Sequence, residues 1–407
     1  MEEKYIVKIN KLDHFGRGIS RIENIPVFVV NALVDEEVEI RIINKKKSYM
    51  EANVVKYIKT SSKRIKGLCP YYNVCGGCNI MHMAYSDQLV YKENKIKEIM
   101  LKFLNYDNIK PIIKCNDLNY RNKITLQVND KIGYFKQKSY DIVEINECII
   151  ADNNINVVIK QLKKINLKNI KQIVVRTTKK ETMLVFYIKD TIIEKEILNN
   201  FKDVDTIILI NDKEKVIKGS GYITENINYL KYVISATSFF QVNRVGMENL
   251  YNKVLEYGQF NQNDKVLDLY CGTGTIGIYI SKYCKEVLGI EINKEAIKDA
   301  FENKKINEIK NIDFKSGDVK DVLNKSNFKP NIIIVDPPRN GLDSGTIKHL
   351  LNLKSNKIIY VSCDPITLAR DLNILKDKYN IVEITPFDMF VHTYHVECVV
   401  LLTWKEF

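Results

Sequence analysis

The second half of the chain alternates short apolar runs with helix-like segments, and this rhythm constrains the fold more than any other feature of the sequence. After about residue 240, KVLDLYCGTGTIGIYISKY and EVLGIEINKEAIKDAFENKKIN each predict a strand, a loop and a helix. NIIIVDPPRNGLD and KIIYVSCDPITLARDL add two apolar strands followed by polar loops. Such alternation predicts a doubly wound parallel sheet of the α/β class, with ligands at the carboxyl ends of the strands. We assign residues 236–407 to this Rossmann-like domain.

The first half of the chain has a different pattern. Residues 1–60 alternate apolar and polar residues with period two, which predicts a small OB-like β-barrel of a kind that often binds oligonucleotides. A stripe of apolar residues at helical spacing predicts a helix at 85–104. Strands return after about residue 119, interrupted by one helix near NINVVIKQLKKI. We therefore expect a β-rich central domain over residues 61–235.

A glycine loop follows the first strand of the α/β domain. Gly272, Gly274 and Gly277 have the spacing G-x-G-x-x-G, and glycine lets a loop pass close to a ligand. Alone, this spacing is also compatible with a dinucleotide site or with a turn that binds nothing. Asp268 before the loop suits a cationic amino-acid group, and Glu291 at the end of the next strand can hold ribose hydroxyls. We therefore favour S-adenosylmethionine, and a methyltransferase over a dehydrogenase.

A carboxylate and two prolines follow a further apolar strand. Asp336 is succeeded by Pro337, Pro338 and Arg339, and prolines fix the backbone while removing two N–H donors. A rigid, polar strand end beside a cofactor loop is suited to holding a planar base by its edge. Related loops in enzymes that methylate exocyclic amines have an aromatic residue where this chain has Arg339. A stiff turn with a capping Asp is the alternative interpretation.

Cys363 lies where the last apolar strand of the alternating series gives way to a loop. A buried thiol at such a position usually only packs, but this one is expected at the edge that carries Asp336. C5 of uracil becomes nucleophilic when a thiolate adds to C6, and the C5 proton must then be removed by a base. Glu397 in FVHTYHVECVVLL is our candidate for that base, because partial desolvation can raise a carboxyl pKa. His392 and His395 are interpreted equally well as core residues or as RNA contacts.

Charge and composition bear on the partner and the compartment. The formal net charge is +12 and the pI is about 9.0, which favours a polyanion such as nucleic acid, although a general lysine bias would give the same surplus. No apolar run approaches the ~18 residues that a membrane span needs, and the first residues contain no signal sequence. We expect a cytoplasmic protein with no membrane partner.

Three of the nine cysteines cluster in CPYYNVCGGC. Cys69, Cys75 and Cys78 need a fourth thiol to complete a metal site, and Cys148 in VEINECII is the best remaining candidate. Four thiolates bind either zinc or a 4Fe–4S cluster. The absence of a second close cysteine pair disfavours a zinc ribbon of the paired type.

Seven short motifs occur in one order along nearly the whole chain: CPYYNVCGGC, YRNK, FFQVN, DLYCGTGTIG, DPPRNG, SCDPITLARD and HTYHVE. Together they resemble the bacterial RNA uracil-5-methyltransferases that make 5-methyluridine in 23S ribosomal RNA. The resemblance implies S-adenosylmethionine as methyl donor, a 4Fe–4S cluster in the central domain and an RNA-binding TRAM domain at the N-terminus. It also implies that the helix at 85–104 packs on the catalytic domain. We expect the enzyme to be a monomer.

The family's functional residues are transferred motif by motif. The resemblance places the nucleophile at Cys363 and the base at Glu397. Its cofactor contacts fall on Gln241, Tyr270, Glu291 and Asp336, beside Asp268, Gly272 and Gly274 from the loop itself. Its iron–sulfur ligands fall on Cys69, Cys75, Cys78 and Cys148.

One departure and three alternatives accompany this interpretation. The family tends to have ALPGE in the TRAM turn, whereas this chain has ALVDE, so that Asp35 replaces glycine. The cysteine motif and the TRAM module favour the ribosomal RNA enzymes over the tRNA enzymes, which usually lack both. An RNA cytosine-5-methyltransferase would use the same thiol chemistry, but its cysteine is expected after proline, and Cys363 follows Ser362. A non-catalytic RNA-binding protein with a metal site is the alternative from another class.

Overall fold

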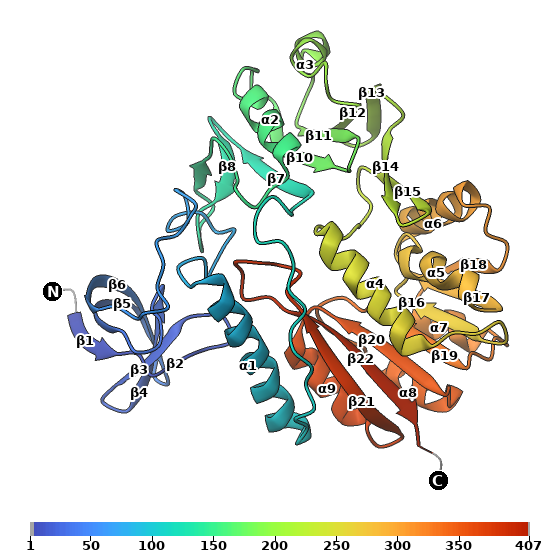
Figure 1. Cartoon of the computed structure of the whole chain (residues 1–407). Helices are drawn as coiled ribbons and strands as arrows, with labels where there is room; N and C mark the ends of the chain where they lie inside the picture. The colour runs from blue at the N-terminus through green and yellow to red at the C-terminus, as the bar shows by residue number, and fades with distance from the viewer. Residues whose placement is uncertain (1–3, 406–407) are drawn as a thin grey trace.

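The computed structural model describes residues 4–405, whose strands form four sheets (Figure 1). The first sheet has the order β1-β5-β6-β4-β3-β2, and β4 and β6 are parallel while its other pairs are antiparallel. Its strands are β1 (Lys4–Lys8), β2 (Lys11–Leu12), β3 (Gly18–Ile22), β4 (Ile25–Val30), β5 (Glu37–Lys45) and β6 (Met50–Lys59). Alternate apolar residues of these strands, such as Val27, Val29 and Val38, form one buried core.

The turn before β5 shows how Asp35 can replace the glycine of the ALPGE motif. Asp35 has a backbone φ of +69°, in the left-handed region that glycine adopts without strain and aspartate tolerates better than most residues. Its N–H donates to the Ile9 carbonyl at 3.0 Å. The turn that the family builds with glycine is therefore formed here with aspartate.

The central sheet has the order β13-β12-β11-β10-β7-β8-β9. Its strands are β7 (Lys123–Val128), β8 (Ile132–Phe135), β9 (Ile142–Glu144), β10 (Ile170–Thr177), β11 (Thr182–Ile188), β12 (Thr206–Ile210) and β13 (Glu214–Lys218). The expected helix is α2 (Asn153–Leu162), and the sequence pattern did not predict α3 (Glu194–Asn200), which shares the same core. A separate hairpin, β14 (Tyr222–Ile227) with β15 (Leu230–Ser235), packs into the core of the C-terminal domain through Ile223 and Tyr232.

The C-terminal sheet has the order β18-β17-β16-β19-β20-β22-β21, and its first five strands are parallel. Its strands are β16 (Lys265–Leu269), β17 (Glu286–Glu291), β18 (Ile312–Ser316), β19 (Ile332–Val335), β20 (Lys357–Ser362), β21 (Tyr379–Phe387) and β22 (Glu397–Trp404). The predicted doubly wound α/β fold is confirmed; β22 pairs antiparallel with β20 at one edge, and β21 pairs antiparallel with β22. The strand order reverses between β16 and β19, where such folds bind ligands.

Helices cover both faces of this sheet. One face shares its core with α4 (Arg244–Gly258), α5 (Thr275–Ile280) and α6 (Lys294–Ile306), and a 3-10 turn at Ser281–Tyr283 follows α5. The other face shares its core with α7 (Val319–Asn324), α8 (Ser344–Leu353), α9 (Pro365–Leu375) and α1 (Tyr85–Leu104). Nearly continuous burial along β19 and β20 explains why these strands are apolar throughout rather than alternating.

α1 ties the N-terminal half of the chain to the C-terminal domain (Figure 1). Its buried residues Ile96, Ile99 and Met100 lie in the same apolar cluster as Leu368 and Leu372 of α9. The chain then runs along the edge of β21, where the N–H groups of Lys110 and Ile113 donate to the carbonyls of Ile384 and Pro386 at 2.9 Å each. None of the helices between residues 4 and 405 is both long and apolar enough to span a bilayer.

Candidate active site and cysteine pocket

A pocket opens beside the switch point of the C-terminal sheet. Five of the residues expected to contact the cofactor line it: Gln241, Asp268, Tyr270, Gly272 and Asp336. They come from the segment before α4, from β16 and the loop after it, and from the residue that follows β19. The structure thus brings together side chains that are far apart in the sequence, at the place that the fold predicts for a ligand.

The three motif glycines serve different purposes. Gly272 has φ +54°, and a Cβ there would face open space, which leaves room for a ligand. Gly274 has φ +76° and does not line the pocket; its Cβ would lie 2.6 Å from the ring of Phe314. A Cβ at Gly277 would lie 2.8 Å from Oδ2 of Asp268. Only the first glycine is therefore open to the pocket, and the other two allow the helix to pack closely on the sheet.

Two carboxylates support this loop. Asp268 Oδ2 accepts from the Gly277 N–H at 2.9 Å, while its buried Oδ1 has no hydrogen-bond partner within residues 4–405. Burial raises the pKa of Asp268 to about 8, and Asp336 and Glu291 add to the rise. Glu291 accepts from the Gly272 N–H at 3.2 Å and lies beside the pocket rather than among its lining residues. A buried carboxyl with a free oxygen fits a cationic ligand, because it lacks a partner of opposite charge.

Cys363 and Glu397 are brought together by strand pairing. β20 and β22 are antiparallel, and Ser362 lies opposite Cys398. Continuing that register by one residue sets Cys363 across from Glu397. Burial raises the pKa of the partly exposed Cys363 thiol to about 12, and the charges of Glu397 and Asp336 contribute to that rise, against Arg339.

The electrostatics of Glu397 link it to the same group. Burial raises its pKa to about 8; Asp336 raises it further and Arg339 opposes the rise. Burial also raises the pKa of Asp336 to about 7. Asp336 and Arg339 therefore both act on the pKa values of Cys363 and Glu397, and Asp336 also lines the cofactor pocket.

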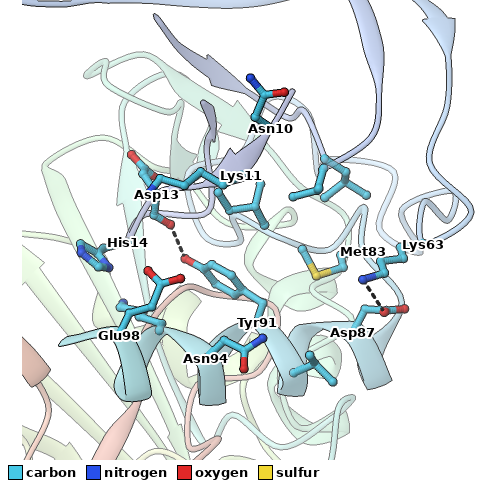
Figure 2. A pocket seen from close by; sticks show the side chains of 15 residues that line it. Asn10, Lys11, Asp13, His14, Lys63, Met83, Asp87, Tyr91, Asn94 and Glu98 are labelled. Carbon is cyan, nitrogen blue, oxygen red and sulfur yellow. Dashed lines mark hydrogen bonds and ion pairs between the residues drawn. The ribbon is translucent and has the colours of Figure 1, made fainter. Parts of the chain in front are cut away.

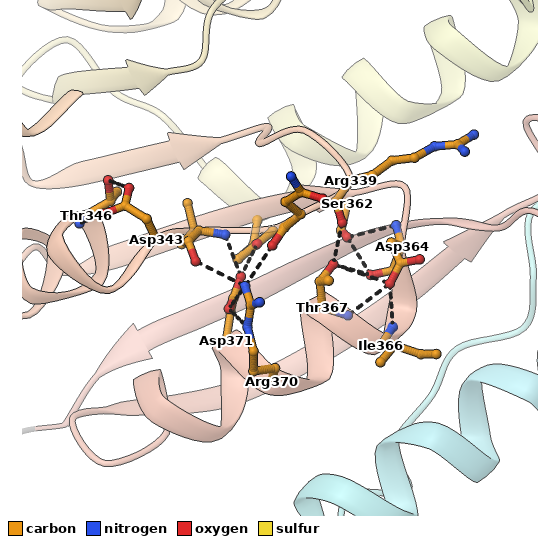
Figure 3. A network of polar contacts seen from close by, with 12 residues as sticks. Arg339, Asp343, Thr346, Ser362, Asp364, Ile366, Thr367, Arg370 and Asp371 are labelled. Atoms are coloured by element: carbon orange, nitrogen blue, oxygen red, sulfur yellow. Dashed lines mark hydrogen bonds and ion pairs between the residues drawn. The ribbon is translucent and has the colours of Figure 1, made fainter. Parts of the chain in front are cut away.

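A polar network ties the Asp-Pro-Pro loop to the cysteine turn (Figure 3). Asp364 caps α9 by accepting from the N–H groups of Ile366 and Thr367 at 3.0 and 2.9 Å, and Thr367 Oγ1 donates to the Arg339 carbonyl at 3.0 Å. Arg370 Nη2 donates to the carbonyls of Asn340 and Leu342. The network fixes the two loops that carry Asp336 and Cys363 relative to each other.

Asp371 anchors the same network from inside the domain. It is fully buried, and its Oδ2 accepts from the Leu342 N–H and from the Tyr360 hydroxyl, both at 2.7 Å. Arg370 Nε donates to its Oδ1 at 2.8 Å. Every charge in this anchor is hydrogen-bonded, which is the condition under which buried ions are tolerated.

The four cysteines of the predicted metal site line one pocket in the central region, together with Tyr72, Tyr134 and Arg121. All four are free thiols. Burial raises the pKa of Cys75 to about 11 and that of Cys78 still further, and neighbouring thiols add to both shifts. Within residues 4–405, no three His, Cys, Asp or Glu side chains are arranged to hold a metal ion.

Comparison with known proteins decides the family. The model of the tRNA (uracil-5-)-methyltransferases matches residues 84–405, and a TRAM domain model matches residues 3–55. The chain belongs to the RNA uracil-5-methyltransferase family. The predictions of an RNA methyltransferase and of an N-terminal TRAM domain are confirmed. The alternatives of a dehydrogenase and of a non-catalytic binding protein are wrong.

Full-length relatives and one solved structure agree with this assignment. Uncharacterized RNA methyltransferases from Clostridium tetani and Oceanobacillus iheyensis are 34% and 35% identical, covering 98% and 99% of this chain and 96% and 97% of their own. The crystal structure of the Pyrococcus abyssi tRNA (uracil-54, C5)-methyltransferase in complex with S-adenosyl-L-homocysteine has a TM-score of 0.82 and 30% identity, covering 98% of this chain and 99% of that one. This methyltransferase therefore uses S-adenosylmethionine.

The comparisons show the reaction family and leave two RNA classes. The neighbour that aligns over 98% of this chain is a tRNA enzyme, whereas the two relatives are described as RNA methyltransferases.

The two histidines of HTYHVE differ in the structure. His392 is buried with φ +64°, and its backbone and ring both contact Gln88, so that it belongs to the packed interior. His395 is partly buried, and burial followed by the charges of Arg339 and Lys95 lowers its pKa to about 4. The core interpretation therefore fits His392, whereas His395 keeps part of its ring exposed.

Two further features were not singled out from the sequence. Phe239 lines the mouth of the cofactor pocket while 66% of its surface is exposed, and only its place in FFQVN pointed to it. A groove runs between the TRAM sheet and α1, where Tyr91 donates to the Asp13 carbonyl and Lys63 pairs with Asp87 (Figure 2). This groove depends on the contact between two elements far apart in the chain, which no local pattern reveals.

Proposed function

We propose that the enzyme methylates C5 of a uridine in 23S ribosomal RNA through a covalent adduct with Cys363. The observation that carries the proposal is the register that sets Cys363 across from Glu397, beside Asp336 at the wall of the cofactor pocket. Nucleophile, base and donor site then share one edge of the sheet, as this chemistry requires.

The proposed reaction has four steps, which begin and end with the Cys363 thiolate. The Cys363 thiolate forms a bond to C6 of uracil, and the electrons of the C5–C6 double bond make C5 enolate-like. When bound, S-adenosylmethionine would supply an electrophilic methyl group; C5 takes that group as its bond to the sulfonium sulfur breaks, and S-adenosylhomocysteine leaves as a neutral thioether. Glu397 takes the C5 proton, the double bond re-forms, and the C6–sulfur bond breaks to release the thiolate. Arg339 favours the charged forms of both Cys363 and Glu397.

Phe239 suits the flipped substrate base. An aromatic ring that is 66% exposed at the pocket mouth offers a stacking surface, and a uridine must leave its helix to reach Cys363. Asp336 and the rigid Pro337–Pro338 backbone lie at the same edge and would hold the edge of that base.

The RNA class is tested by nucleoside mapping. The seven motifs support 23S ribosomal RNA, whereas the Pyrococcus abyssi structure supports tRNA as the second candidate. Mass spectrometry of nucleosides from a deletion strain, with site mapping, should show loss of 5-methyluridine from 23S ribosomal RNA and its return on complementation. Loss of 5-methyluridine from tRNA alone would show that tRNA is the substrate instead of 23S ribosomal RNA. Loss of 5-methylcytidine would show that the enzyme methylates cytosine instead of uracil.

We also propose that Cys69, Cys75, Cys78 and Cys148 hold a 4Fe–4S cluster. Four free thiols line one pocket, and the sequence has no second close cysteine pair of the kind that forms a paired zinc ribbon. Four thiolates are also the ligand set of a 4Fe–4S cluster. When bound, it would supply a rigid link between segments that carry the cysteines.

Iron content tests this second part. Anaerobically purified protein should be brown and contain about four irons per chain, as four thiolate ligands imply. Cys148→Ser should lose most of that iron, while Cys284→Ser should retain it, because the Cys284 thiol is buried in the core of the C-terminal domain and donates to the Ile280 and Ser281 carbonyls. Zinc in place of iron in the wild-type protein would contradict the proposal.

A further inference from the structure

The segment between β21 and β22 leads directly into Glu397, and distant parts of the chain hold its backbone. Asn243 Nδ2 donates to the Met389 carbonyl at 3.1 Å, and the Tyr120 hydroxyl donates to the Val391 carbonyl at 3.0 Å. The position of Glu397 therefore depends on more than its own strand.

α1 supplies two of these contacts through lysines. Lys92 is fully buried; its Nζ pairs with Asp388 and donates to the Phe390 carbonyl at 3.1 Å. Lys95 Nζ donates to the Tyr394 carbonyl at 2.9 Å. A buried ion pair is seldom more stabilising than apolar residues of the same size, so its expected contribution here is to fix one geometry.

His392 is the centre of the arrangement. Its N–H donates to Gln88 Oε1 at 3.2 Å, and its Nδ1 lies 3.1 Å from Gln88 Nε2, which is a donor. Nδ1 must then accept, so this ring is neutral. The left-handed backbone of His392, φ +64°, turns its carbonyl towards the cysteine-bearing loop.

The loop that follows Cys78 connects the cysteine pocket to the segment before Glu397. The N–H groups of Asn79 and Ile80, directly after Cys78, both donate to the His392 carbonyl, at 2.9 and 3.1 Å. Val391 shares an apolar cluster with Tyr72 and Met81, which also line the cysteine pocket. The wall of that pocket and the segment before Glu397 are thus in direct contact.

We propose that the segment from Asp388 to Val396 couples the filling of the cysteine pocket to the position of Glu397, and that Gln88 and His392 are positioning residues for this base. The inference rests on the proposed roles of Glu397 and of the four cysteines. A filled pocket holds Asn79 and Ile80 in place and keeps Glu397 across from Cys363. An emptied pocket releases the His392 carbonyl, which slows proton removal from C5 without preventing attack by Cys363.

Hydrogen exchange on the full-length protein tests the coupling. Iron-containing enzyme is compared with the same protein after chelator treatment, with iron measured in both. Amides in 388–397 should exchange at least about tenfold faster after iron removal, while β16 should not change. Unchanged exchange in 388–397 after verified loss of iron would overturn the inference.

Two variants of His392 separate positioning from general damage. His392→Asn tolerates the left-handed backbone and keeps an acceptor towards Gln88, whereas His392→Gly keeps only the backbone. We expect His392→Gly to trap 5-fluorouridine RNA within about twofold of the wild-type rate but to release methylated RNA at least about tenfold more slowly. His392→Asn should release it within about threefold of wild type.

The outcomes distinguish the two proposals. Equal slowing of trapping and release in His392→Gly, or normal release, would overturn the positioning role while leaving the covalent mechanism intact. A wild-type enzyme that traps no RNA at all would contradict the proposed function itself. Melting temperatures of both variants show whether the fold is retained.

Discussion

The cofactor pocket and the Cys363–Glu397 pair lie at the same edge of one sheet, yet they are built in opposite ways. Most of the cofactor pocket comes from one strand–loop–helix unit, in which Asp268 and Gly272 are four residues apart. The reactive pair depends on antiparallel pairing of β20 with β22, and on contacts from α1 and the cysteine loop to the segment before Glu397. We therefore expect donor binding to tolerate distant changes, and the proposed proton removal by Glu397 to be sensitive to them.

Glu397→Gln is expected to have the largest effect, because it should impair catalysis without changing the cofactor pocket. Loss of the base should lower turnover about 10²- to 10⁴-fold and leave methylated RNA attached to the protein, while affinity for the cofactor stays unchanged. Gel analysis of protein–RNA complexes with labelled donor measures both. Glu383→Gln, at a partly buried carboxylate of β21, is the matched control and should turn over normally. Normal product release by Glu397→Gln would exclude this residue as the base.

Asp268→Asn is expected to weaken donor binding while leaving the Cys363–Glu397 pair unchanged. An amide keeps an acceptor for the Gly277 N–H but offers no charge to a cationic donor, so S-adenosylmethionine should bind about 10- to 100-fold more weakly. The free protein should be at least as stable as wild type, because a buried carboxyl is removed. Calorimetry and thermal melting provide the two readouts, with the exposed Asp313→Asn of β18 as control. Unchanged affinity for S-adenosylmethionine would show that Asp268 does not contribute to binding the donor.

The pH dependence of product release examines the base alone. Burial raises the pKa of Glu397 to about 8, and the carboxyl must be ionised to accept the C5 proton. Release in single-turnover reactions should therefore rise about tenfold per unit towards pH 8 and then level off. A profile that is flat from about pH 6 to 9 would show that Glu397 is already ionised below neutrality, against the expectation from its burial.

The smallest effect is expected from Arg370→Ala. Its guanidinium is half exposed, and it joins the Asp-Pro-Pro loop to α9 through the carbonyls of Asn340 and Leu342. Loss of these bonds should cost about 1–2 kcal/mol of stability and lower kcat a few-fold, with little change in donor affinity. Urea unfolding and steady-state kinetics measure these effects. A selective loss of donor affinity would show that the two regions are less separate than their construction suggests.

The sequence predicted what is encoded locally. The strand–glycine loop–helix unit, the parallel sheet and the helix at α1 follow from periodicity and turn chemistry, and the structure has them at nearly the expected residues. Gly274 shows the limit of that reasoning, because its φ and the nearby ring of Phe314 already require a glycine there, whether or not a ligand contacts it. The contacts of Gln88 and Lys92 with the segment before Glu397 join residues about 300 positions apart, which single-sequence patterns do not encode.

Trapping with 5-fluorouridine RNA tests the central claim most directly, because fluorine at C5 replaces the proton that Glu397 must remove. Incubation with S-adenosylmethionine should yield a stable protein–RNA complex, and mass spectrometry after digestion should place the methylated fluorouridine on Cys363. Cys363→Ser should form none, and Cys284→Ser should form as much as wild type. Attachment at another residue, or equal trapping by Cys363→Ser, would contradict the covalent mechanism.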